Sequence, residues 1–251
     1  MAKSCQRVCR DAGDFVSALA RGSAYTRAMM RWLRPIFLVL VFVHANLLAP
    51  YPAHGEPLVI PTYVAPPLAG SGDDGTLAQW ALQSWQRASN KTLQFVPAPE
   101  SSALLRLYWV DAGHVGGFGE MRPIRVNGRP GAAVYVNIET ELLGEEIAAQ
   151  ARADRLYRDS IVYLTCVHEL GHGIGLLHTA DYQDIMYSFQ YGGDIPAYFG
   201  RYRRRIQSQA QIARTDAFSA ADLLQFQRII AERKTRPAVG GLRGLRAPAS
   251  P

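Results

Sequence analysis

The stretch "HELGHGIGLLHTADYQDIM" spans residues 168–186 and contains three of the six histidines in the chain. His168 and His172 are four residues apart, so on a helix their imidazoles lie on one face and can reach one point. Gly175 is expected to end that helix, because glycine readily adopts the left-handed conformation that reverses a chain. The reversal would bring His178 back to the same point. The spacing therefore predicts three imidazoles that bind one metal ion.

Zinc is the metal that this ligand set favours, since catalytic zinc sites use three protein ligands and keep a fourth position for water. Glu169 follows the first histidine, and a carboxylate there can take a proton from the water that the metal activates. A structural zinc site is the main alternative, but it needs a fourth ligand. Cys166 lies two residues before His168 and so points to another side of the helix. A chance match to the five fixed positions has odds on the order of one in ten thousand.

The charge distribution argues against nucleic-acid binding, although the whole chain has a net charge of +6. Residues 1–55 hold 7 basic and 2 acidic side chains, and residues 233–251 hold 5 basic and none acidic. Residues 56–232 therefore keep 15 basic and 19 acidic side chains, a net charge of −4. A mildly acidic folded region does not suit a phosphate backbone.

Residues 1–55 are predicted to be an N-terminal extension with a signal peptide. Arg31 and Arg34 precede an apolar run over residues 36–49, which is too short for a comfortable membrane span. Cleavage before Glu56 would give an exported protein, secreted or periplasmic. The alternative is an uncleaved anchor, which would be the chain's one association with a membrane.

Cysteine usage predicts no disulfide in the exported chain. Cys5 and Cys9 precede the apolar run, and Cys166 is the one cysteine after it. A single thiol is more typical of a buried apolar residue than of a nucleophile.

Periodicity and turn residues indicate the remaining organisation. Ser219 is expected to cap the last helix, and Asp73 or Asp74 the first, with a metal-blocking carboxylate as the alternative role of this pair. Pro130 is expected to make the hairpin around Asn127 and Gly128 irregular. The expected elements are an extended lead-in over 56–75, a helix over 75–90, strands over 92–97 and 104–110, a loop over 111–120, two strands within 122–138, a helical stretch over 140–158, an apolar run over 160–177 that contains the histidine helix, an irregular basic segment over 188–216, a helix over 220–232 and a disordered basic tail over 233–251.

The string H-E-x-x-H-x-x-G-x-x-H from His168 to His178, followed by Met186, resembles the signature of the metzincin metallopeptidases. Within that clan the chain is similar to the matrixin type from about residue 75 to residue 232, on the strength of this motif, the first helix with the strands after it, and the closing "FSAADLLQFQRI". The resemblance implies an α+β fold. A twisted, mostly parallel sheet and two helices would lie above a zinc cleft, and an irregular lower subdomain would hold a Met-turn and the C-terminal helix. The catalytic domain would span residues 76–232.

The same resemblance implies a zinc-dependent endopeptidase that cuts protein or peptide substrates and acts as a monomer. Calcium is not supported, because acidic loops of the required density are lacking. The alternative function is a non-catalytic surface or adhesion module of the same fold, stabilised by zinc. The resemblance implies that His168, His172 and His178 are zinc ligands, that Glu169 is the general base and that Met186 forms the Met-turn. It implies that the substrate pairs with an edge strand over 133–137, which includes Val134, Tyr135 and Val136. It also places Leu164 in the specificity pocket, which would favour a hydrophobic residue just after the cleaved bond.

Overall fold

The computed structural model describes residues 56–68, 72–111, 113–115 and 117–235. The predicted signal peptide and the tail beyond residue 235 lie outside the described residues. None of the described helices is long and apolar enough to cross a membrane. The strands are β1 (Leu58–Val64), β2 (Leu93–Pro97), β3 (Leu105–Val110), β4 (Gly119–Val126) and β5 (Arg129–Asn137), and the helices are α2 (Asp74–Ala88), α3 (Glu145–Ala153), α4 (Arg155–Ile174), α5 (Ile195–Arg203), α6 (Gln209–Ile212) and α7 (Ala220–Thr235), with short 3-10 turns η1 (Thr140–Leu142) and η2 (Phe189–Tyr191).

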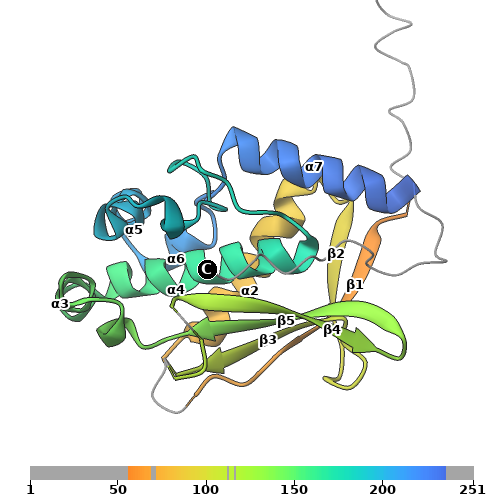
Figure 1. The fold of residues 1–251 in the computed structure, drawn as a ribbon, viewed down its shortest axis with the longest axis horizontal. Helices are drawn as coiled ribbons and strands as arrows, with labels where there is room; N and C mark the ends of the chain where they lie inside the picture. Colours follow the sequence, from red (N-terminus) through yellow and green to blue (C-terminus); the bar gives the residue numbers. More distant parts are fainter. Residues whose placement is uncertain (1–55, 69–71, 112, 116, 236–251) are drawn as a thin grey trace, which may run out of the picture. The chain divides into compact units, whose positions relative to one another are not determined.

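The strands form a mostly parallel sheet, as predicted, in the order β2-β1-β3-β5-β4 (Figure 1). Strands β2, β1, β3 and β5 run parallel to one another, whereas β4 runs antiparallel to β5 at the edge. Helix α2 makes the crossover from β1 to β2, which is the connection that parallel neighbours require.

Strand β1 corrects the prediction for residues 56–75, because Leu58–Val64 is a full member of the sheet rather than a lead-in. It pairs with β2 on one side and with β3 on the other. Pro61 lies within this strand, although proline cannot donate to a ladder. Here its carbonyl accepts a hydrogen bond from the Leu104 N–H at 2.8 Å. The sheet therefore includes a strand that precedes residue 76.

The β4–β5 hairpin is regular, so the expected irregularity at Pro130 was wrong. Asn127 and Gly128 have φ angles of 51° and 77°, the two positive values of a tight two-residue turn. Pro130 lies opposite Arg125. This pair is a non-hydrogen-bonded one, in which neither N–H points to the partner strand. Proline has no N–H, but at residue 130 this costs the hairpin no hydrogen bond.

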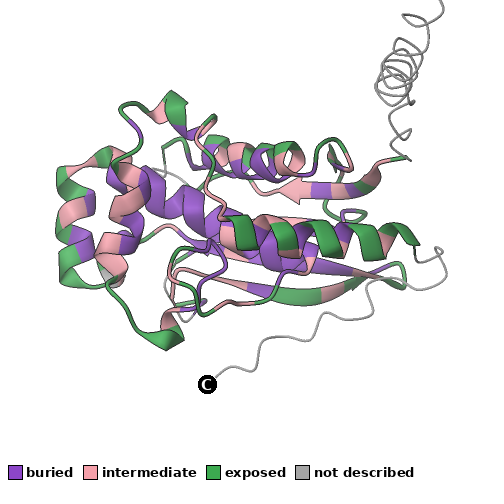
Figure 2. Cartoon of the chain, turned by 90° about the horizontal axis from the view of Figure 1, so that it is seen from above, coloured by how far each residue is buried: buried purple, intermediate pink, exposed green. Residues whose placement is uncertain are grey.

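Helix α4 is buried along most of its length, between the sheet and the other helices (Figure 2). Asp154 interrupts the helical stretch expected over 140–158, with extended backbone angles and a side chain that accepts the Leu156 N–H at 2.9 Å. Helix α2 packs against α4, and the Trp85 indole donates to the Val167 carbonyl at 3.0 Å. Cys166 is fully buried, and burial raises the pKa of its thiol well above the usual range. Its thiol is therefore not a nucleophile.

The segment after Met186 is more ordered than predicted, because it contains η2, α5 and α6. The basic cluster there has structural contacts. The Arg201 guanidinium lies over the rings of Tyr182 and Tyr198, and Arg203 pairs with Asp154 at 2.6 Å. Both arginines are therefore partly buried in contacts with neighbouring residues.

The last helix begins as predicted, because the Ser219 hydroxyl accepts the Asp222 N–H at 3.0 Å. The helix continues to Thr235, so the first three residues of the expected disordered tail are helical. Burial lowers the pKa of Arg233 in this last turn to about 10. The rest of the tail is outside the described residues.

Candidate metal centre

The three histidines meet where α4 ends. Gly175 has a φ of 116°, and its N–H bonds to the carbonyls of Gly171 and His172 as the chain reverses. The Nε2 atoms of His168 and His178 are 3.2 Å apart, those of His172 and His168 3.1 Å, and those of His172 and His178 3.0 Å. The structure thus brings all three predicted ligands to one point, as a group that could hold a metal ion.

Backbone carbonyls set the orientation of two of these rings. The Nδ1–H of His168 donates to the Ile185 carbonyl at 2.7 Å, and the Nδ1–H of His172 donates to the Leu176 carbonyl at 2.9 Å. A carbonyl can only accept, so both Nε2 atoms present lone pairs to the centre. Zinc ligands at about 2.0–2.1 Å in a tetrahedron lie about 3.3 Å apart, close to the observed separations. The donor set therefore fits a zinc-sized cation.

Burial keeps the three imidazoles in the neutral form that a metal requires. It lowers the pKa of His172 to about 4 and that of His168 well below its usual range, and the neighbouring imidazoles add to the effect. Burial also lowers the pKa of His178. At pH 7 all three rings can therefore bind a metal ion without first losing a proton.

The metal-free protein is expected to lose stability as the pH falls from 6.5 towards 4. The folded pKa of His172 lies below the unfolded value of 6.5, so the unfolded state binds the proton first and the contribution is complete only above pH 6.5. This one ring accounts for about 3 kcal/mol. Urea unfolding with a chelator present would measure the slope. The variant His172→Gln should flatten it, and an unchanged slope would contradict the assignment.

Met186, which was predicted to form the Met-turn, is fully buried. A Cβ on Gly171, between the two helical histidines, would come within 2.6 Å of the Met186 sulfur, so glycine allows this close approach. The Ile185 and Met186 N–H groups both donate to the Asp222 carboxylate, at 2.8 and 3.3 Å. A buried acid on α7 therefore holds the turn whose carbonyl orients His168. This role of Asp222 has no local sequence signal, because its spacing from Ser219 indicates only a helix cap.

Glu169 lies on the same helix and is only 6% exposed. Burial, with a smaller contribution from the charge of Glu120, raises its pKa to about 8. Its side chain packs against the start of β4, where a Cβ on Gly119 would come within 2.7 Å of the Glu169 Cγ and 2.8 Å of the Tyr135 carbonyl. The edge strand therefore passes directly beside the carboxylate. Sequence analysis did not single out Gly119 or Glu120.

If Glu169 is the general base that the sequence predicts, Gly119→Ala should lower turnover about 10²-fold, because displacing a reacting group by about 1 Å costs that much. The added methyl group meets a backbone carbonyl that cannot yield, so the Glu169 side chain has to move. Zinc content should stay at that of the wild type. Gly117→Ala is the matched control, since a Cβ there meets nothing within 4 Å. Equal turnover in both variants would contradict the proposed packing.

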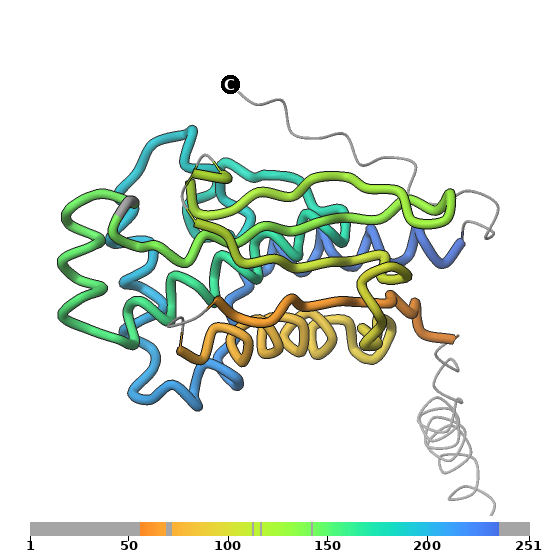
Figure 3. Tube along the Cα trace, turned by 90° about the horizontal axis from the view of Figure 1, so that it is seen from below, coloured from red at the N-terminus to blue at the C-terminus, as the bar shows by residue number. Residues whose placement is uncertain are grey.

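The prediction that residues 133–137 form an edge strand was wrong. Strand β5 lies between β3 and β4, so the backbones of Val134, Tyr135 and Val136 are paired on both sides and cannot pair with a substrate. Strand β4 occupies the edge instead, as Figure 3 shows from the other face. Leu164, one helical turn before His168, is 4% exposed within the hydrophobic core.

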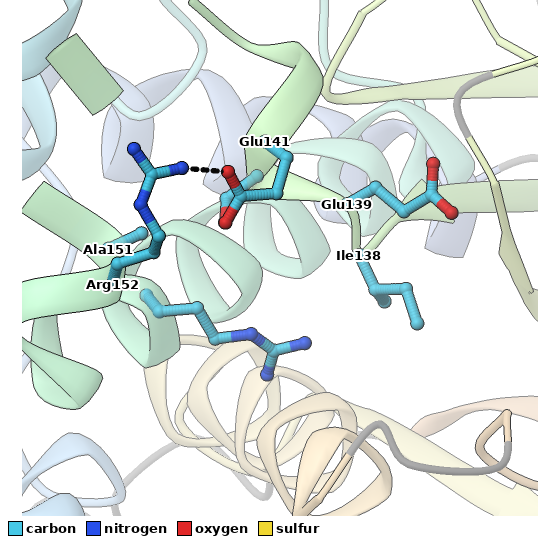
Figure 4. A pocket seen from close by; sticks show the side chains of 7 residues that line it. Ile138, Glu139, Glu141, Ala151 and Arg152 are labelled. Atoms are coloured by element: carbon cyan, nitrogen blue, oxygen red, sulfur yellow. Dashed lines mark hydrogen bonds and ion pairs between the residues drawn. The ribbon is translucent and has the colours of Figure 1, made fainter. Parts of the chain in front are cut away.

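A separate cavity of about 570 Å³ lies near the other end of α4 (Figure 4). Arg158 is ten residues before His168, which corresponds to about 15 Å along a helix, so this cavity is not part of the histidine site. Arg158 forms an ion pair with the fully buried Asp74. Neither Asp73 nor Asp74 caps α2 through its side chain. Because the Asp74 carboxylate pairs with Arg158, it lies away from the histidines. The cavity is lined by Ile138, Glu139, Thr140, Glu141, Ala151, Arg152 and Arg158.

Comparisons with known proteins give little independent guidance. No protein-family model and no curated protein matches the chain. Among solved structures it is similar to archaemetzincin from Methanopyrus kandleri, at 16% sequence identity and a TM-score of 0.35, over 73% of this chain and 99% of that chain. A likeness this distant does not assign a family or an activity.

Proposed function

We propose that this protein is a zinc-dependent metalloendopeptidase of the metzincin type, with matrixin-like features. The observation that carries the proposal is the convergence of three Nε2 atoms within 3.0–3.2 Å of one another. Two of them are oriented by backbone carbonyls, and a glutamate lies next to the first histidine in the sequence. This combination matches the residues that peptide hydrolysis by a zinc site requires.

In this proposal His168, His172 and His178 hold the metal through Nε2. Bound zinc would lower the pKa of a water molecule and stabilise negative charge on the carbonyl oxygen of the substrate. The Glu169 carboxylate accepts the proton of the attacking water and returns it to the leaving amine. Without a metal, burial raises the pKa of Glu169 to about 8. The charge of a bound zinc ion would lower this pKa towards neutral pH, where the group can both gain and lose a proton. Met186 supports the rings from below.

The substrate is proposed to be an extended protein or peptide segment that pairs with the edge of β4. That edge passes beside Glu169, which supports this placement. Leu164 is proposed to favour a hydrophobic residue just after the cleaved bond. Export through the segment before Glu56 and a monomeric state complete the proposal. No described feature favours nucleic acid.

The test is cleavage of casein and of a quenched-peptide library by the zinc-loaded protein. We expect one zinc per chain, hydrolysis, and inhibition by chelators and hydroxamates. A folded, zinc-loaded protein that cleaves no peptide would exclude the proposal. If a chelator then lowered the melting temperature sharply without any hydrolysis at any stage, the alternative of a zinc-stabilised, non-catalytic module would be correct.

A further inference from the structure

The hairpin register determines which groups of β4 face outward. The Asn137 N–H donates to the Phe118 carbonyl at 2.9 Å, so residue 118 faces β5. Because antiparallel positions alternate, the even-numbered residues of β4 face β5 and the odd-numbered ones face away from it. Gly119, Met121 and Pro123 therefore direct their backbones to the free edge.

This free edge offers few donors. Within the described residues, no group hydrogen-bonds to the outward N–H groups of Gly119 and Met121. The next outward position is Pro123, which has no N–H. An extended peptide can therefore receive two backbone hydrogen bonds beside Glu169, and the ladder is interrupted at the third outward position.

The other end of this edge is closed by aromatic rings. The Phe118 ring lies 5.5 Å from that of Phe189 and 5.0 Å from that of Phe199, measured between ring centroids. Phe189 belongs to η2 and Phe199 to α5, both in the segment after Met186. At Phe118 the sheet edge and the segment that follows the Met-turn are therefore in contact.

We propose that Phe118 and Pro123 bound a short substrate track on β4, which consists of the outward backbone groups of Gly119 and Met121. The proposal rests on the proposed function, and it makes these two residues determinants of substrate length. A peptide strand has to displace the aromatic contact at one end and loses its donor at the other. The enzyme therefore recognises a few residues around the cleaved bond, and longer substrates gain nothing from further pairing.

Proline in an edge strand also prevents pairing between protein copies. That role alone would leave peptide cleavage independent of residue 123. The dependence of kcat/KM on substrate length therefore distinguishes a residue that bounds the track from one that only prevents pairing between protein copies.

The first experiment measures kcat/KM for quenched peptides lengthened one residue at a time on either side of the cleaved bond. For the wild type we expect an early plateau. Pro123→Ala should raise the value for the longer peptides about fivefold, the effect of one added hydrogen bond, without changing it for the shortest. Phe118→Ala should extend the plateau on the other side.

The matched controls are Pro130→Ala and Phe95→Ala. Pro130 is in β5, and its position does not reach the free edge. Phe95 is a partly buried phenylalanine in β2, at the opposite edge of the sheet. Both controls should keep the wild-type plateau. Efficiency that rises steadily with length in the wild type, or a plateau unchanged in both test variants, would overturn the proposal.

The second experiment does not depend on catalysis. Amide hydrogen exchange of zinc-loaded Glu169→Gln is measured with and without an uncleaved peptide from the library. Protection at Gly119 and Met121 but not at Arg125 is expected, and protection that includes Arg125 would overturn the track. If this footprint is found although the wild type cleaves nothing, the proposed function fails while the track stands.

Discussion

Replacing Glu169 with glutamine is expected to lower kcat/KM by about 10³-fold, within the range that general bases contribute. Glutamine has nearly the same shape but cannot accept the proton. The metal should remain, because the three converging atoms are histidine nitrogens. Zinc content and the peptide assay on the same preparation would measure both results. Loss of zinc along with activity would mean that Glu169 supports the site rather than acts as its base.

The pH profile of peptide cleavage distinguishes a general base from a purely structural role of Glu169. In the proposed mechanism the ionised form of Glu169 accepts the proton, so activity should rise with pH on the acidic side of the profile. The negative charge of Glu120 contributes to the raised pKa of Glu169. The variant Glu120→Gln should therefore move the acidic limb to lower pH. Glu141→Gln is the control, because Glu141 pairs with Arg152 and does not affect Glu169.

The histidine group was predictable from the sequence because its geometry is almost entirely local. His168 and His172 share a helical face by spacing alone, and Gly175 supplies the one backbone conformation that the reversal needs. The short connection from Gly175 to His178 then limits the positions that the third imidazole can reach. The first helix and the tight turn at Asn127 and Gly128 were predictable for the same reason, since each depends on neighbouring residues.

The order of the strands was not predictable in the same way, because it depends on pairing between distant segments. Strand β5 has the more apolar sequence of the hairpin, which is what burial on both sides requires. The implied resemblance nevertheless placed the substrate on it. The two prolines show a related limit. Whether Pro61 or Pro130 weakens a strand depends on which way its missing N–H would point, and only the register determines that.

Asp222 illustrates the same limit at the site itself. Its spacing after Ser219 indicates a helix cap, and it does accept the Ser219 N–H at 2.8 Å. Its second task involves the N–H groups of Ile185 and Met186, more than thirty residues earlier in the chain. No local pattern predicts a contact of that kind.

Replacing Asp222 with asparagine is expected to weaken zinc binding about 10- to 100-fold, the usual cost of losing a group that orients a ligand. Asparagine has one acceptor oxygen where the carboxylate has two, and its NH₂ group would face an N–H of the turn. The Ile185 carbonyl that orients His168 would lose its fixed position. Stability should also fall by about 2–3 kcal/mol, because the buried N–H that faces the NH₂ group loses its acceptor.

Zinc affinity by chelator competition, together with urea unfolding, would measure both effects of Asp222→Asn. Asp216→Asn is the control for charge, because Asp216 is exposed. Ser219→Ala is the control for the start of the helix, because it removes the hydroxyl that accepts the Asp222 N–H and donates to Asp184, and it leaves the Asp222 carboxylate on the turn. If Ser219→Ala weakened zinc binding as much as Asp222→Asn, the contacts of Ser219 would be the whole contribution. If only Asp222→Asn does so, the path from α7 through Ile185 to His168 is what holds the first imidazole in place.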